Sequence, residues 1–74
     1  MTELEMIRLD RIDFINKYLR PEGYLIAVKF RNGMKYLDLF NASGDCLKSL
    51  FAGSYKEMDL YISGMYNLLN LQSK

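Results

Sequence analysis

Few residues of this chain have the types or the spacing that catalysis needs. The sequence has no histidine and one cysteine, Cys46. Without histidine there is no Ser-His-Asp or Cys-His nucleophile, and one thiol alone cannot assemble a zinc site. The acids Asp10 and Glu57 stand at expected helix starts, where negative charge complements the helix dipole. We therefore expect a protein that is not an enzyme, with no catalytic, metal or cofactor site.

Positive charge gathers between residues 17 and 35, where five basic side chains accompany one acidic side chain. The candidate nucleic-acid site lies here and comprises Lys29, Arg31, Lys35 and Tyr36. Basic side chains contact phosphates, and an exposed aromatic ring stacks on a base. The alternative is a solvated face with a cation–π contact or a diagonal Lys29–Asp38 ion pair. The net charge of only +1 argues against a dedicated nucleic-acid binder.

A second candidate surface lies on the last expected helix, outside its main apolar arc. It consists of Leu60, Gly64, Leu68 and Leu71. A small residue framed by leucines allows another helix to approach closely, so these residues form a candidate partner-binding or self-association surface. The alternative is that the N-terminal segment covers Leu60 and Leu71.

Helix signals mark both ends of the chain. Thr2 and Glu5 have the spacing of a capping box, and Pro21 followed by Gly23 predicts the end of the first helix. This helix is well supported from Asp10 onward, whereas residues 1–9 could be a loose, extended arm. Residues 54–57 form another capping box, which opens an amphipathic helix that runs to about Leu71.

The segment between the helices predicts a β-hairpin. Asn32-Gly33 favours a two-residue type I′ turn, which places Arg31 opposite Met34 and Lys29 opposite Tyr36. This register puts a set of apolar side chains on one face: Ile26, Val28, Phe30, Leu37 and Leu39. Residues 46–51 are ambiguous. Leu47, Leu50 and Phe51 have helical spacing, so we favour a short helix and keep a third strand as the alternative.

These elements predict a single α+β domain over residues 1–74. It would contain an N-terminal helix, an antiparallel hairpin of two or three strands, and a C-terminal amphipathic helix on one sheet face. A domain of this size is marginally stable alone, so a partner subunit is a plausible support. One unpaired cysteine, no apolar leader and no membrane span suggest the cytoplasm.

Two family resemblances arise from these residues. A helix, a hairpin, a third strand and a last helix would resemble the double-stranded-RNA-binding fold and the similar HicA-type toxins. HicA-type nucleases use a histidine, and those RNA-binding domains carry a lysine cluster at the last helix, whereas Tyr55-Lys56-Glu57 has one lysine. Separately, Val28-x-Phe30-x-x-Gly33-x-x-Tyr36 is similar to the small KTSC domain. Neither resemblance implies functional residues here.

The function that this sequence favours is a non-enzymatic protein-binding module of the regulator or inhibitor type. A homodimer is one form it could take, and a phage or mobile-element accessory protein would suit the size. The alternative is a nucleic-acid-binding domain that uses the basic hairpin face. We expect a protein partner and no membrane contact.

Overall fold

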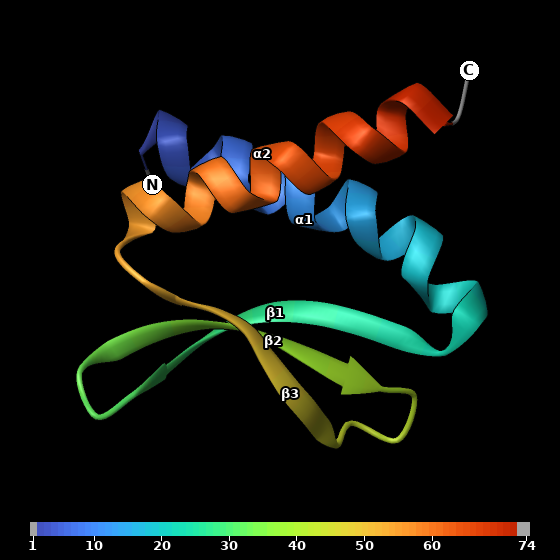
Figure 1. Cartoon of the computed structure of the whole chain (residues 1–74), viewed down its shortest axis with the longest axis horizontal. Coiled ribbons are helices and arrows are strands. Elements are labelled where there is room, and N and C mark those ends of the chain that lie inside the picture. Colours follow the sequence, from blue (N-terminus) through green and yellow to red (C-terminus); the bar gives the residue numbers. More distant parts are fainter. Residues whose placement is uncertain (1, 73–74) are drawn as a thin grey trace.

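The computed structural model describes residues 2–72, which fold as a helix, three strands and a second helix, with a short 3₁₀ turn after the first helix. The elements, in chain order, are α1 (Glu3–Leu19), η1 (Arg20–Glu22), β1 (Tyr24–Arg31), β2 (Met34–Asn41), β3 (Cys46–Gly53) and α2 (Tyr55–Gln72). Both helices lie on the same face of the antiparallel sheet, whose strand order is β1-β2-β3 (Figure 1). The predicted α+β architecture is therefore confirmed.

Helix α1 is continuous from Glu3. The hydroxyl oxygen of Thr2 accepts a hydrogen bond from the Glu5 main-chain N–H at 3.2 Å, as the capping-box spacing predicted. Residues 3–9 are therefore helical and do not form an extended arm, while Met1 lies outside the described residues. The helix gives way to η1, which carries Pro21 and ends at Gly23 with a φ of 85°.

The β1–β2 hairpin has the predicted turn and register. Asn32 and Gly33 both have positive φ, 52° and 76°, as a type I′ turn requires. Arg31 pairs with Met34 and Lys29 pairs with Tyr36. The pairing of these two strands is therefore the one that the turn residues predict.

The segment from Cys46 to Gly53 is a third strand, so the favoured prediction of a short helix at 46–51 is wrong. β3 pairs with β2, but its register shifts twice, between Leu37 and Asp38 and between Leu39 and Phe40. Each shift inserts a residue and breaks the alternation of side chains. The apolar residues therefore acquire a helix-like spacing, although hydrogen bonding along β2 makes the segment a strand.

The core lies between the sheet and the helices. Its buried apolar side chains come from both layers: Ile12, Ile15, Ile26, Leu37, Met58 and Ile62. Val28 and Leu39 pack against this cluster, but Phe30, which we also expected there, is 64% exposed. Phe30 stands near the hairpin tip, which curves away from the helices (Figure 1). The Phe30 and Tyr55 rings are nearly perpendicular, at a centroid distance of 6.1 Å.

The two helices run in the same direction (Figure 1), and polar side chains join them. The Arg8 guanidinium donates two hydrogen bonds to the Asp59 carboxylate, at 2.5 and 3.0 Å. One turn further along, Arg11 donates to the Ser63 hydroxyl at 2.5 Å. These bonds explain why two arginines interrupt the apolar face of α1, because they reach across to α2.

Helix α1 also caps the edge strand β1. The Asn16 side-chain amide donates to the Ile26 carbonyl at 3.1 Å, and its oxygen accepts from the Ile26 N–H at 2.8 Å. One buried side chain therefore satisfies both main-chain groups of a residue on a strand that has a single strand neighbour. Across residues 2–72, no helix is both long enough and apolar enough to cross a membrane.

Candidate functional site

The predicted partner-binding residues form one exposed surface on α2, which we call the α2 stripe: Leu60, Gly64, Leu68 and Leu71. They recur every three or four positions and so share one side of the helix. Leu60 is 70% exposed, Leu68 is 58% exposed and Leu71 is 68% exposed. The alternative that the N-terminal segment covers Leu60 and Leu71 is therefore wrong.

The other sides of α2 are occupied, which fixes where the stripe points. Met58 and Ile62 are buried against the sheet. Asp59 and Ser63 bond to arginines of α1, as described above. On the remaining flank, the Tyr61 ring lies 5.5 Å from the Phe51 ring of β3. The α2 stripe is thus the side of the helix that points away from the rest of the fold.

Gly64 has no evident role in the packing of the chain itself. A Cβ atom built at this position would meet no described atom within 4 Å, other than neighbouring helix backbone. Glycine in a helix interior is less stable than alanine by about 1 kcal/mol, because the unfolded chain loses more entropy. The fold of one chain therefore carries this cost without a packing reason.

The basic hairpin residues divide between the two faces of the sheet. Lys29, Arg31 and Tyr36 lie together on the open face, away from the helices. Lys35 faces the helix side, where its ammonium nitrogen lies 4.8 Å from the centre of the Tyr55 ring. Lys35 is therefore not part of a common nucleic-acid surface with the other three.

Arg31 is engaged by an acid of the central strand. Its guanidinium donates to both carboxylate oxygens of Asp38, and the Ser49 hydroxyl donates to the same carboxylate at 2.7 Å. The Arg31 guanidinium also lies over the Tyr36 ring, 4.2 Å from its centre. Asp38 thus pairs with Arg31 and not, as the diagonal arrangement suggested, with Lys29. The Lys29 ammonium lies 5.5 Å from the centre of the Phe40 ring.

This cluster has a defined charge state. The Asp38 side chain is fully buried, and the Arg31 side chain is 43% exposed. The hydrogen bonds from Arg31 and then from Ser49 hold the pKa of Asp38 below its usual value, against the opposing effect of burial. The charge of Arg31 is balanced within the fold, so a phosphate would compete with Asp38 for it.

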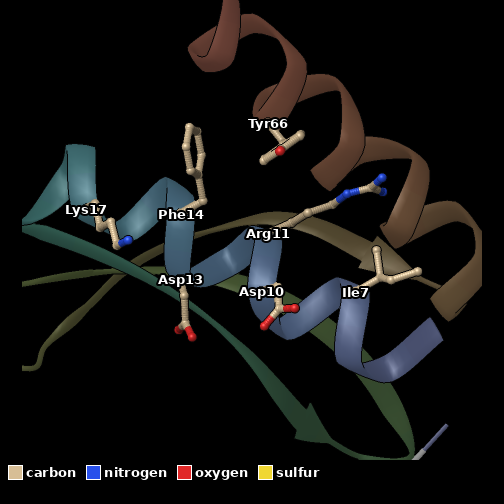
Figure 2. Close-up of a pocket in the computed structure, with 7 residues that line it drawn as sticks. All are labelled: Ile7, Asp10, Arg11, Asp13, Phe14, Lys17 and Tyr66. Carbon is tan, nitrogen blue, oxygen red and sulfur yellow. The ribbon is translucent and has the colours of Figure 1, made fainter. Parts of the chain in front are cut away.

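A groove of about 510 Å³ is lined by six residues of α1 and by Tyr66 of α2 (Figure 2). Phe14 and Tyr66 form an edge-to-face pair in its lining, with ring centres 4.9 Å apart. Asp10 and Asp13 point away from this aromatic pair (Figure 2). Since Arg11 is bonded to Ser63, the lining does not present a set of polar groups that converge on a ligand.

The remaining ionisable residues of the described chain form no further candidate site. Cys46 is an exposed free thiol. Within residues 2–72, no three side chains of histidine, cysteine, aspartate or glutamate gather closely enough to hold a metal ion.

Two polar clusters were not predicted from the sequence: Arg8 with Asp59, and Arg31 with Asp38 and Ser49. The sequence sign of the Arg8–Asp59 cluster was that Arg8 and Arg11 interrupt the apolar face of α1. Their partners are 51 and 52 residues away along the chain, so only the packing of α2 reveals them.

Comparison with protein-family models, with curated proteins and with solved structures gave no significant match for this chain. The elements follow one another as helix–strand–strand–strand–helix, and no matched structure supports either of the family resemblances.

Proposed function

We propose that this chain is a small protein-binding module of the regulator or inhibitor type, and that the α2 stripe is its contact surface. One observation carries the proposal: three leucines on one side of α2 are each more than half exposed around an unpacked glycine. Contiguous apolar side chains at a surface are typical of protein interaction sites. The exposed Cys46 suits a reducing compartment such as the cytoplasm.

The two-layer arrangement supports the same proposal. Both outer surfaces of the molecule, the far sides of the helices and the open face of the sheet, face solvent (Figure 1). Other large apolar side chains are exposed, including Leu4, Met6 and Leu9 of α1. By their spacing, Met6 and Leu9 lie on a different side of α1 from Leu4, whereas Leu60, Leu68 and Leu71 all lie on one side of α2. A helix that presents leucines at such intervals matches the helix-in-groove and helix-pairing modes of recognition.

A photo-cross-linking residue at position 68 tests the contact surface directly. The modified protein would be made in its own cells, irradiated and examined for adducts of higher mass. The same residue at position 17, an exposed site on α1, is the matched control. We expect a protein adduct from position 68 and none from position 17. Equal labelling from both positions, or none from position 68, would contradict the proposal.

A second candidate function is nucleic-acid binding by the open sheet face, because Lys29, Arg31 and Tyr36 do gather there. Since Arg31 also holds Asp38, the sharper variant is Lys29→Glu with Tyr36→Ser, which leaves that ion pair intact. Fluorescence anisotropy with single- and double-stranded RNA at two salt concentrations would measure binding. Affinity that falls with salt and is lost in the variant would favour this function over the first.

A further inference from the structure

We propose that the partner of the α2 stripe is a second copy of this chain, bound with the two α2 helices antiparallel and crossing at Gly64. The inference rests on the proposed function, because it names the occupant of the same surface. Three features of the described chain lead to it: the symmetric placement of Leu60 and Leu68, the glycine midway between them and the distribution of charge.

Within the stripe, Leu60 and Leu68 are symmetric about Gly64, whereas the mirror position of Leu71 is Glu57. Leu60 lies four residues before Gly64, and Leu68 lies four residues after it. A two-fold axis through Gly64 that reverses the helix direction places Leu60 of one copy against Leu68 of the second copy, and the same contact occurs twice. Such a self-complementary patch is what an isologous dimer requires.

In this arrangement Gly64 has a packing role that it lacks in the single chain. With no side chain at the crossing point, two helix backbones approach closely, and the flanking leucines pack over the gap. A Cβ atom built at Gly64 would have open space around it in the single chain. A helix contact across it would therefore account for a residue that weakens the isolated helix.

Charge favours the antiparallel orientation. From Leu60 to Gln72 the helix has no charged residue, whereas its first turn carries Lys56 and Glu57. A parallel pair would align the two helix dipoles and bring Glu57, which lies seven residues before Gly64 and so on the stripe side, close to Glu57 of the second copy. In the antiparallel pair, each charged first turn meets the uncharged last turn of the other copy, and the dipoles oppose.

The available area sets the expected strength. A specific dimer needs about 500 Å² from each copy, which is roughly a tenth of the 5204 Å² surface of this chain. The stripe extends about 17 Å along the helix at 1.5 Å per residue. A contact limited to one helix side of this length would bury an area near the lower limit for a specific interface. We therefore expect a weak dimer, with a Kd on the order of 10 μM.

A charge exchange across the interface tests both the partner and the orientation. Leu60→Glu and Leu68→Lys are separate variants at exposed positions, and circular dichroism would verify that each remains folded. Sedimentation velocity would measure mass across about three decades of concentration around the expected Kd. We expect the wild type to dimerise and each variant alone to be monomeric. An equimolar mixture of the two variants should form a heterodimer, because the introduced carboxylate of one copy then faces the introduced ammonium of the other.

Controls separate the possible outcomes. Met6→Glu introduces the same charge on the outer side of α1, where Met6 is 54% exposed, and it should leave the dimer intact. A second mixture combines Leu60→Glu with Leu60→Lys. If this mixture forms heterodimers and the mixture of Leu60→Glu with Leu68→Lys does not, the antiparallel arrangement is wrong.

A wild type that stays monomeric throughout would overturn the second copy as partner. If the cross-linker at position 68 then captured a different protein, the proposed function would stand without this inference. If it captured no protein, both would fall.

Discussion

At the scale of single residues, the structure depends on two buried polar side chains beside the sheet. Asn16 pairs with the main chain of Ile26, and Asp38 pairs with Arg31 and Ser49. Every buried side-chain nitrogen or oxygen in the described part of the chain has a partner. A buried polar group that loses its partner retains its full desolvation cost, so these positions tolerate substitution poorly.

Asn16→Ala should lower the free energy of unfolding by about 2–3 kcal/mol, because it leaves both main-chain groups of Ile26 without their partner. Urea denaturation at neutral pH would measure the change. Asn67→Ala, on an exposed part of α2, is the matched control and should change stability by less than about 0.5 kcal/mol. Similar effects for the two variants would show that the Asn16 bonds contribute little.

Because of Asp38, the free energy of unfolding should depend on pH in the acidic range. In the unfolded chain this carboxylate titrates at about pH 3.9, and in the fold its pKa is lower because of Arg31. As pH falls through this interval the unfolded state takes up the proton first, so stability decreases. Its contribution is complete above the unfolded pKa and is lost as pH falls through the folded pKa.

The variant Asp38→Asn isolates this effect. We expect it to be less stable than the wild type at neutral pH, with a difference that shrinks as the pH falls below about 4. Urea midpoints measured at a series of pH values would show the convergence. A difference that stays constant with pH would mean that the Arg31–Asp38 pair does not control the acid response.

At the scale of elements, the parallel docking of α1 and α2 decides which side of α2 faces solvent. The Arg8–Asp59 pair is central to this docking. The Arg8 side chain is 9% exposed, the Asp59 side chain is 27% exposed, and the guanidinium also lies 3.9 Å from the centre of the Tyr55 ring. A largely buried ion pair fixes orientation, although its net contribution to stability is small.

Asp59→Ala should destabilise the fold by about 2–3 kcal/mol, because it leaves the Arg8 charge buried without a partner. The double variant Arg8→Met with Asp59→Leu removes both charges and should recover most of the loss. Chemical denaturation of the single and double variants would measure the coupling. If the double variant were less stable than Asp59→Ala, the ion pair would stabilise the fold beyond offsetting the desolvation cost of its two charges.

Gly64→Ala should stabilise the isolated fold by about 0.5–1 kcal/mol, since alanine is the better helix former and its methyl group has space. The measurement should use dilute protein, so that self-association does not contribute. Gly33→Ala is a contrasting control, because Gly33 has a φ of 76° and should lose stability on substitution. Loss of stability in Gly64→Ala would show that the position is constrained within the single chain.

At the scale of the whole molecule, two layers form a slab with extents of 38 × 30 × 19 Å. A chain of 74 residues in this shape buries a small core and leaves both outer surfaces in solvent. Any contact that covers the α2 stripe therefore adds substantially to a small stability. Stability and association should be coupled, because a partner that binds only the folded chain shifts the unfolding equilibrium.

The melting temperature of the wild type should rise by several degrees when its concentration rises about 100-fold through the expected Kd, since the dimer stabilises only the folded state. The Leu60→Glu variant should show no such rise. Differential scanning calorimetry at several concentrations would measure both proteins. A melting temperature independent of concentration in the wild type would argue against the dimer.

The sequence by itself determined the features that neighbouring residues control. Thr2 caps the first helix, and Asn32-Gly33 sets the turn and the register of the hairpin. The amphipathic pattern of α2 placed Leu60 and Leu71 outside the core. These features were predictable because capping, turn geometry and side-chain periodicity act over a few residues, and no distant contact opposes them.

Only the tertiary structure decided the features that depend on residues far apart in the chain. Residues 46–53 are a strand because β2 offers an edge to pair with, and their bulges hide the strand alternation. Phe30 is exposed because the hairpin tip curves away from the helices (Figure 1). Arg8 and Asp38 find their partners on other elements. Composition and spacing contain no direct record of such contacts, because packing creates them.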